Sequence, residues 1–118
     1  MKNEKPYDLE ERTFEFARDC RLFVSKLKKT ISNIEDSKQL IRASGSVGAN
    51  YIEANENLGE KDFLFRLKIA RKEAKESRYW LRLLKTMNQE HVTTIDSLIT
   101  EANELRKILS TIINKHQD

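Results

Sequence analysis

The segment from Gln39 to Glu56 constrains the fold most, because its apolar positions keep a helical spacing across a run of small residues. The positions three or four residues apart are Leu40, Ser44, Val47, Tyr51 and Asn55. Two of the chain's three glycines lie inside this segment, and each costs a helix about 1 kcal/mol relative to alanine. We therefore predict one unbroken helix whose thin middle lets another helix approach closely. The residues expected at that close contact are Ser44, Gly45, Gly48 and Ala49.

The alternative for this segment is a flexible or phosphate-binding loop. A P-loop follows a β-strand and places a lysine and then a serine or threonine after its glycines. The sequence offers neither feature here. The helical interpretation is therefore favoured over the loop.

Composition places the rest of the chain in the same structural class. With 118 residues, three glycines, one proline and 35% charged residues, the chain is expected to be one helical domain with short loops. We expect residues 1–7 to be a disordered tail and residues 8–118 to form the domain. No apolar run reaches the roughly 18 residues of a membrane span and no signal peptide is recognised, so a cytoplasmic protein without membrane contact is expected. The single Cys20 suits a reducing compartment and is expected to pack as a small hydrophobic residue.

The first helix is predicted to run from Leu9 to Lys29. Asp8 precedes it as an N-cap, and Glu11 completes a capping box three residues later. Its apolar face, in steps of three and four, consists of Leu9, Thr13, Phe16, Cys20, Phe23 and Leu27. This face is expected to be buried.

The second helix, which contains the small-residue segment, is predicted to begin at Ile34 or Asp36 and to end near Asn57. A capping box is possible at its start over residues 32–35. Gly59 is expected to stop the helix, as glycine often does after a helix end.

The third helix is predicted from Glu60 to Met87 and has the most regular apolar pattern. Its seam consists of Phe63, Leu67, Ala70, Ala74, Ser77, Leu81 and Leu84. After a loop at residues 88–93, a fourth helix capped by Thr93 or Thr94 is predicted to reach Lys115. Its seam consists of Ile95, Leu98, Ala102, Leu105, Leu109 and Ile112. Four long helices with short connections bury such faces on one another as an all-α, up-down-up-down four-helix bundle.

The third and fourth helices carry more apolar surface than one bundle core needs. Outside the seam of the third helix lie Phe65, Ile69, Trp80 and Leu83, and outside that of the fourth lie Ile99, Ile108 and Ile113. A second copy of the chain is the expected partner for this surface, which predicts a homo-oligomer. The alternative is a monomer with a broad core and a few exposed aromatic side chains.

Basic residues concentrate on the third helix. Residues 61–85 contain nine Lys or Arg and three acids, a local net charge of +6, whereas residues 31–60 carry a local net charge of −3. Helical spacing aligns six of the cations in what we call the basic stripe: Lys68, Arg71, Lys75, Arg78, Arg82 and Lys85. Such a row can neutralise the phosphates of RNA or DNA. The alternative is a solvated face whose cations pair with acids of a neighbour.

Carboxylates on the second and third helices raise the question of a di-iron site. Such a site in a bundle needs Glu-x-x-His on two helices, and neither His91 nor His116 has a glutamate three residues before it. We therefore predict no metal and no cofactor. Glu73 projects toward apolar surroundings and is expected to form an ion pair with Arg42.

Catalytic residues are not indicated by the sequence. Ser44 and Ser46 have no nearby histidine and no nucleophile elbow, and Cys20 has no evident activating base. An enzyme would need a site assembled between subunits, or a deep pocket lined by Ser44, Arg42 and Glu73.

Two runs of sequence resemble a known family: QLIRASGSVGANYIEANE at residues 39–56 and KDFLFRLKIARKEAKESRYWLRLL at residues 61–84. The family consists of four-helix-bundle proteins encoded in intervening sequences of bacterial 23S rRNA genes. It is related to the accessory variability protein of diversity-generating retroelements. The resemblance spans about residues 7–115 and implies an up-down bundle, a ring-shaped homopentamer and no catalytic activity. It also implies nucleic-acid binding, because the retroelement relatives are basic and bind nucleic acid and a reverse transcriptase.

The first hypothesis for function is a non-enzymatic, oligomeric bundle that binds the backbone of RNA or DNA through the basic stripe, as an accessory factor. No motif indicates base-specific readout, and Tyr79 is the aromatic residue beside the stripe. The alternative is a protein–protein interaction scaffold without nucleic-acid binding, in which the same cations pair with acids of a neighbour or of a partner protein.

Overall fold

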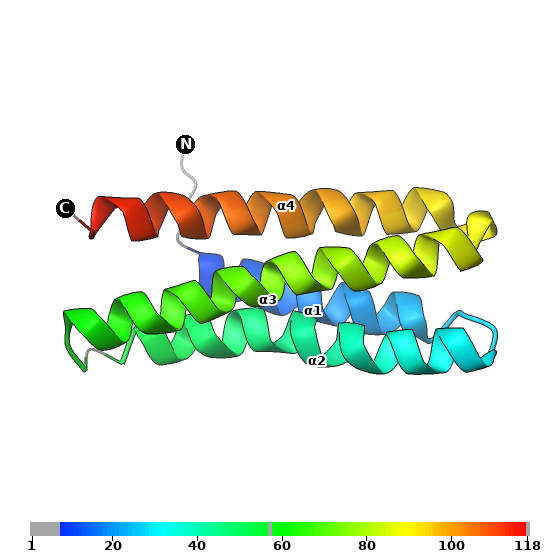
Figure 1. Cartoon of the computed structure of the whole chain (residues 1–118), viewed down its shortest axis with the longest axis horizontal. Coiled ribbons are helices and arrows are strands. Elements are labelled where there is room, and N and C mark those ends of the chain that lie inside the picture. The colour runs from blue at the N-terminus through cyan, green and yellow to red at the C-terminus, as the bar shows by residue number, and fades with distance from the viewer. Residues whose placement is uncertain (1–7, 57, 118) are drawn as a thin grey trace.

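The computed structural model describes residues 8–56 and 58–117, which form four α-helices and one short 3₁₀ helix. These elements are α1 (Leu9–Val24), α2 (Ile31–Ala54), α3 (Glu60–Met87), η1 (Gln89–His91) and α4 (Val92–Lys115). Consecutive helices run in opposite directions, so the fold is the predicted up-down-up-down four-helix bundle (Figure 1). Within the described residues, none of the helices has the length and apolar character that crossing a bilayer requires. The predicted disordered tail lies outside the described residues.

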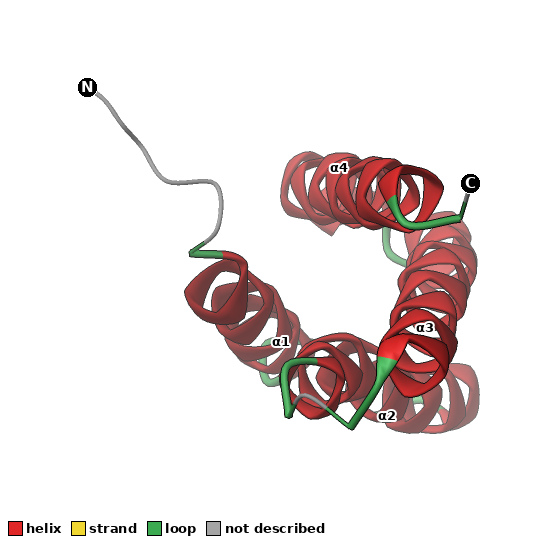
Figure 2. Cartoon of the chain, turned by 90° about the vertical axis from the view of Figure 1, so that its left-hand side faces the viewer, coloured by secondary structure: helices red, strands yellow, loops and turns green. Residues whose placement is uncertain are grey.

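The four helices form an open arc in cross-section. α2 packs on both α1 and α3, α4 packs on α3, and α1 touches α4 only lightly (Figure 2). Arg12 on α1 joins Glu101 on α4 through two hydrogen bonds, Nε to Oε2 at 2.7 Å and Nη2 to Oε1 at 2.9 Å. A polar link therefore joins α1 to α4, while all four helices contribute residues to one apolar core.

The predicted seams supply that core. Phe16 and Phe23 of α1 are almost completely buried, as are the leucines of the α3 and α4 seams. Alanines of α3 and α4 are buried among them and leave room for these larger side chains: Ala70, Ala74 and Ala102. Alternation of large and small residues fills the space between helices without voids. Cys20 is fully buried in the same core, as predicted.

The small-residue segment is an unbroken part of α2, which confirms the helical interpretation. Gly48 is buried against α1, where a Cβ atom would lie only 2.8 Å from the Thr13 hydroxyl oxygen. Ser44 is fully buried, and a Cβ at Gly45 would lie 3.2 Å from the Arg21 guanidinium. Ala49 is exposed and lines a surface hollow between α1 and α2. The neighbour that approaches the thin section is therefore α1 of the same chain.

Neither predicted capping box is formed. Asp8 has φ −75° and ψ 43° and makes no side-chain capping bond, because a capping side chain reaches the helix from an extended backbone. The predicted pairing of Asp8 with Glu11 is therefore wrong. α2 begins at residue 31, earlier than predicted, because the Thr30 hydroxyl accepts a hydrogen bond from the Asn33 amide at 3.1 Å. That bond replaces the predicted box over residues 32–35.

α1 ends at Val24 rather than at Lys29. The Ser25 hydroxyl donates to the Leu22 carbonyl at 2.7 Å, and the following amides bond three rather than four residues back. A side chain that satisfies a terminal carbonyl in this way favours a tight turn over another helical turn. Leu27 is nevertheless buried, as its place in the apolar face predicts.

Gly59 plays a different part from the one predicted. α2 ends at Ala54, short of Asn57. Gly59 has φ 112° and directly precedes α3, where its carbonyl accepts the Phe63 amide at 3.0 Å. Because this backbone conformation favours glycine, Gly59 redirects the chain into α3 rather than stopping α2.

The start of α4 and the last position of its seam also differ from prediction. η1 leads directly into α4 at Val92, so neither Thr93 nor Thr94 is the cap. Ile113 is 1% exposed, whereas Ile112 is only partly buried. A straight helix has 3.6 residues per turn, so a strict heptad pattern drifts around it and shifts the buried position by one residue.

Candidate nucleic-acid interface

The basic stripe runs along the side of α3 that borders α4. Near one end, Arg71 donates from Nη1 to the hydroxyl of Ser110 on α4 at 3.3 Å. Near the other end, Lys85 Nζ lies 2.8 Å from Asp96 Oδ1, also on α4. Because α3 is continuous between these contacts, it holds the cations in one row.

Most of the stripe is exposed and unpaired. Lys68, Lys75, Arg78 and Arg82 are exposed, while Arg71 and Lys85 are partly buried. Among residues 8–56 and 58–117, Asp96 is the acid within 4 Å of a stripe cation, and it pairs with Lys85. The other five cations have no carboxylate partner within this part of the chain: Lys68, Arg71, Lys75, Arg78 and Arg82. Their charges are therefore available to an external anion.

Two surface hollows lie along this face. The first is formed by α3 and α4 and is lined by Arg78, Tyr79, Arg82, Leu83, Lys85, Thr86, Asp96, Ile99 and Asn103. The second lies further toward the start of α3 and is lined by Lys68, Arg71, Lys72, Lys75, Glu76, Tyr79 and Trp80. Cations outnumber acids in both hollows, so each has a net positive charge. Tyr79 borders both.

Lys72 belongs to this surface, although the predicted stripe does not include it. Its Nζ lies 3.9 Å from Glu76 Oε2, and its side chain is exposed. The signal was present in the sequence, because Lys72 is four residues after Lys68 and such residues lie on the same helix face.

Tyr79 and Trp80 form an aromatic pair within this cationic surface. Their ring centroids are 5.0 Å apart and the ring planes meet at 76°, an edge-to-face contact. Trp80 packs against the core, whereas Tyr79 is 52% exposed. The partly buried tryptophan therefore contacts a solvent-facing tyrosine.

Arg42 of α2 lies against two glutamates of α3. Its Nη1 is 3.3 Å from Glu73 Oε1, and its Nη2 is 2.6 Å from Glu76 Oε1. Glu73 is only 6% exposed. Hydrogen bonding to Glu76 raises the pKa of Arg42, with Glu73 adding to the effect. Sequence reasoning proposed Arg42 with Glu73 and missed Glu76, which lies on the same side of α3 three residues later.

The apolar residues predicted at an interface differ in exposure. Phe65 is 59% exposed, whereas Ile69, Trp80 and Leu83 are partly buried. The Trp80 indole nitrogen is buried without a hydrogen-bond partner among the described residues. Intramolecular packing therefore covers part of this side of α3 and leaves Phe65 open.

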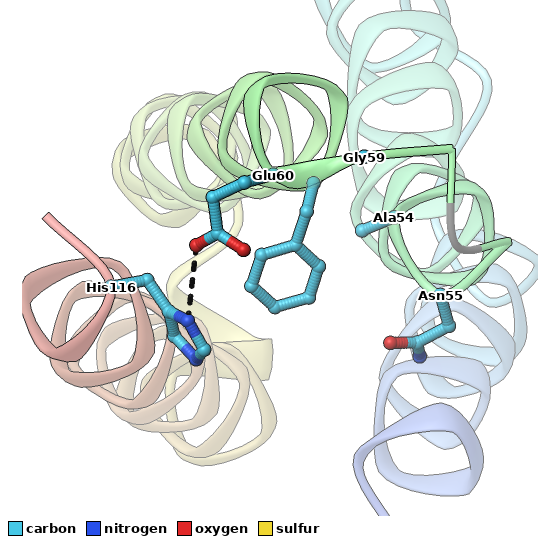
Figure 3. Close-up of a pocket in the computed structure, with 6 residues that line it drawn as sticks. Ala54, Asn55, Gly59, Glu60 and His116 are labelled. Atoms are coloured by element: carbon cyan, nitrogen blue, oxygen red, sulfur yellow. Dashed lines mark hydrogen bonds and ion pairs between the residues drawn. The ribbon is translucent and has the colours of Figure 1, made fainter.

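Histidines lie at opposite ends of the bundle. His116 Nδ1 is 3.1 Å from Glu60 Oε2, which joins the end of α4 to the start of α3 (Figure 3). Its ring also meets Phe63 edge-on, with centroids 5.0 Å apart. His91 instead packs edge-on against Phe23 in the connection before α4. Within the described part of the chain, no three potential metal ligands cluster.

The residues considered for catalysis do not come together. Ser44 is fully buried and its hydroxyl donates to the Ile41 carbonyl at 3.3 Å. Arg42 is exposed and engages Glu73 on α3, so these side chains do not line one pocket with Ser44. Burial raises the pKa of the Cys20 thiol to about 12, which keeps it protonated and unreactive near neutral pH.

Comparison with known proteins identifies the family. A profile of the 23S rRNA-intervening sequence protein family matches residues 6–111. Among solved structures, a protein of unknown function from the S23 ribosomal protein family of Bacteroides thetaiotaomicron matches with 34% identity and a TM-score of 0.75. That match covers 88% of this chain and 96% of the other. No match was found among curated proteins. Because the profile covers nearly the whole bundle, this chain belongs to the 23S rRNA-intervening sequence protein family.

Proposed function

We propose that this protein is a non-enzymatic helical bundle that binds the phosphate backbone of RNA or DNA through the basic stripe, as an accessory factor. The observation that carries the proposal is the row of five exposed or partly exposed cations without an acid partner in the described residues. Like charges three or four residues apart cost a helix about 0.2–0.5 kcal/mol per pair. A polyanion along the stripe removes that repulsion.

The expected binding is independent of base sequence. Lys and Arg along a helix side contact phosphates, which position a nucleic acid without reading it. Each neutralised phosphate releases counterions, so affinity falls steeply as salt rises. The experiment is therefore a salt titration of binding to generic RNA and to duplex DNA, followed by fluorescence anisotropy.

A variant that replaces stripe cations with neutral glutamine, together with a matched control, makes this test specific. The stripe variant combines Lys68→Gln, Lys75→Gln, Arg78→Gln and Arg82→Gln. The control removes the same charge from exposed lysines elsewhere, through Lys26→Gln, Lys28→Gln, Lys29→Gln and Lys115→Gln. The stripe variant should lower the slope of log affinity against log salt by about one per lost phosphate contact, and the control should keep it. Salt-insensitive wild-type binding, or equal losses in both variants, would overturn the proposal.

The second candidate is a protein–protein interaction scaffold, favoured by the exposed Phe65 next to the cations on α3. In that case the unpaired arginines meet acids of another subunit or of a partner protein. Arg71→Glu combined with Arg78→Glu separates the two functions. A scaffold loses assembly, measured as molar mass by light scattering, whereas a nucleic-acid-binding protein keeps its mass and loses RNA binding.

Self-association belongs to the same proposal. Apolar side chains more than half exposed occur on α1 and α3, including Phe14, Leu22 and Phe65. Water contact at such side chains is removed when copies associate, and the family resemblance favours five copies. Light scattering of the wild-type chain should therefore give a mass well above the 13.9 kDa of one chain. A mass of one chain at micromolar concentration would exclude this assembly.

A further inference from the structure

We infer that the ligand of the α3 surface is a single-stranded nucleic acid with a base stacked on Tyr79. The inference rests on the proposed function and adds the class of nucleic acid. Tyr79 borders both cationic hollows, with Lys75 one helical turn before it and Arg82 one turn after it. An exposed aromatic ring therefore lies between two groups of phosphate-binding side chains.

The Tyr79 ring already has an aromatic neighbour before any ligand arrives. Its edge-to-face contact with Trp80 places the ring centroids 5.0 Å apart, while 52% of the residue stays exposed. Trp80 is in turn packed against the core. A side chain that already contacts a neighbour loses less conformational freedom on binding a ligand than a fully free one.

The layout matches the physical requirements of a single strand. From Lys68 to Lys85, α3 extends about 26 Å at 1.5 Å per residue, and Tyr79 lies within that length. A strand following the row places phosphates in the hollows on either side of the ring and a base face on it. Positive grooves with aromatic stacking platforms bind single strands in this way, with little preference for base identity.

A duplex cannot use the same platform. Its base faces are stacked on one another, so it offers a protein only phosphates and the base edges in its grooves. The cations then act alone and Tyr79 contributes nothing. The tyrosine therefore discriminates single strands from duplexes on a surface whose charges attract both.

The experiment compares three fluorescent DNA ligands with the same number of phosphates per strand. They are an oligothymidylate of about 12 nucleotides, the same strand with abasic sites in place of thymidines, and a duplex of equal length. Binding is measured for the full chain and for Tyr79→Ala, with Tyr79→Phe as the matched control that keeps the ring. Because Tyr79 is exposed, folding and molar mass are checked by circular dichroism and light scattering.

Tyr79→Ala should weaken binding of the oligothymidylate by about 5- to 150-fold, the range that base–aromatic stacking supplies. Binding of the abasic strand and the duplex should change less than about twofold, since their contacts are electrostatic. Tyr79→Phe should bind all three ligands as the wild type does. Trp80 is the chain's single tryptophan, so its emission should also change more with oligothymidylate than with the abasic strand.

Equal losses on all three ligands, no loss on oligothymidylate, or a changed molar mass in Tyr79→Ala would each overturn the inference. If the wild type still binds duplex in a salt-dependent manner, the proposed function survives that result. If the wild type binds none of the three ligands, the proposed function itself fails.

Discussion

At Gly48, a single hydrogen atom in place of a side chain lets α1 lie against α2. An added Cβ would be 2.8 Å from Thr13 Oγ1 and 3.2 Å from Thr13 Cβ. We expect Gly48→Ala to lower the free energy of unfolding by about 1–3 kcal/mol, because overpacking outweighs the gain in helix propensity. Urea unfolding followed by circular dichroism measures this change.

Gly45→Ala is the matched comparison on the same helix. The nearest atom to its added Cβ is the Nη2 end of Arg21 at 3.2 Å, which can move aside. We expect this variant to be unchanged or stabilised by up to about 1 kcal/mol, the difference in helix propensity. Equal destabilisation by both substitutions would contradict the close approach at Gly48.

Cys20 gives the molecule an alkaline pH dependence. Burial raises its pKa from 9.0 to about 12. Between these values the unfolded chain releases the thiol proton and the folded chain keeps it, so the free energy of unfolding decreases as pH rises. Cys20→Ala should therefore lose stability less steeply than the wild type over this window. The check is urea unfolding of both proteins at several alkaline pH values, and parallel curves would show that Cys20 does not contribute.

At the scale of elements, the buried side-chain amides of Asn33 and Asn88 join two helices at one end of the bundle. Asn33 Nδ2 donates to Asn88 Oδ1 at 3.0 Å, and Asn88 Nδ2 donates to Asn33 Oδ1 at 2.8 Å. The same nitrogens donate to the carbonyls of Lys28 and Leu84. The pair therefore links the start of α2 to the end of α3.

Removing one member of this pair leaves the other buried and unsatisfied. We expect Asn88→Ala to cost about 1–3 kcal/mol of stability. Replacing both residues with leucine should cost less than the sum of the two single replacements, because no unpaired amide remains. A double-mutant cycle by chemical unfolding measures the coupling, and strictly additive losses would show that the amides act independently.

The elements also show which structural features the sequence determines locally. The bounds of α3 agree with prediction because a long periodic apolar seam defines it and Gly59 precedes it. The ends of α1 and α2 depend instead on single hydrogen bonds of Ser25 and Thr30. Many polar residues near a helix end could make such bonds, so spacing alone does not choose among them. The Asn33–Asn88 pair joins positions 55 residues apart and has no local signal.

The candidate interface was predictable to a similar extent. Helical spacing placed the stripe on one side of α3, and it suggested Arg42 as the partner of Glu73. It did not indicate that Lys85 pairs with Asp96, or that Trp80 contacts Tyr79 edge-on. Those contacts depend on how α4 packs against α3 and on side-chain rotamers, which periodicity does not specify.

For the whole molecule, α1 is the least enclosed helix. It is the shortest of the four in the described chain and contacts α4 only lightly. Arg12 and Glu101, whose side chains are 38% and 29% exposed, link the two. Glu101→Gln should remove up to about 1 kcal/mol and speed amide exchange in α1 by up to about fivefold. Hydrogen exchange with mass spectrometry tests this, and equal acceleration in all four helices would indicate global unfolding instead.

The uneven charge of α2 and α3 has a consequence for how the molecule meets its ligand. Residues 61–85 carry a net charge of +6 and residues 31–60 a net charge of −3, and the two segments lie side by side (Figure 2). The protein is thus a permanent electric dipole, although its total charge is only +3. In the field of a polyanion the protein experiences a torque that turns α3 toward the polyanion before contact. Dissolved ions weaken that torque with distance, so dilute buffer favours correctly oriented collisions.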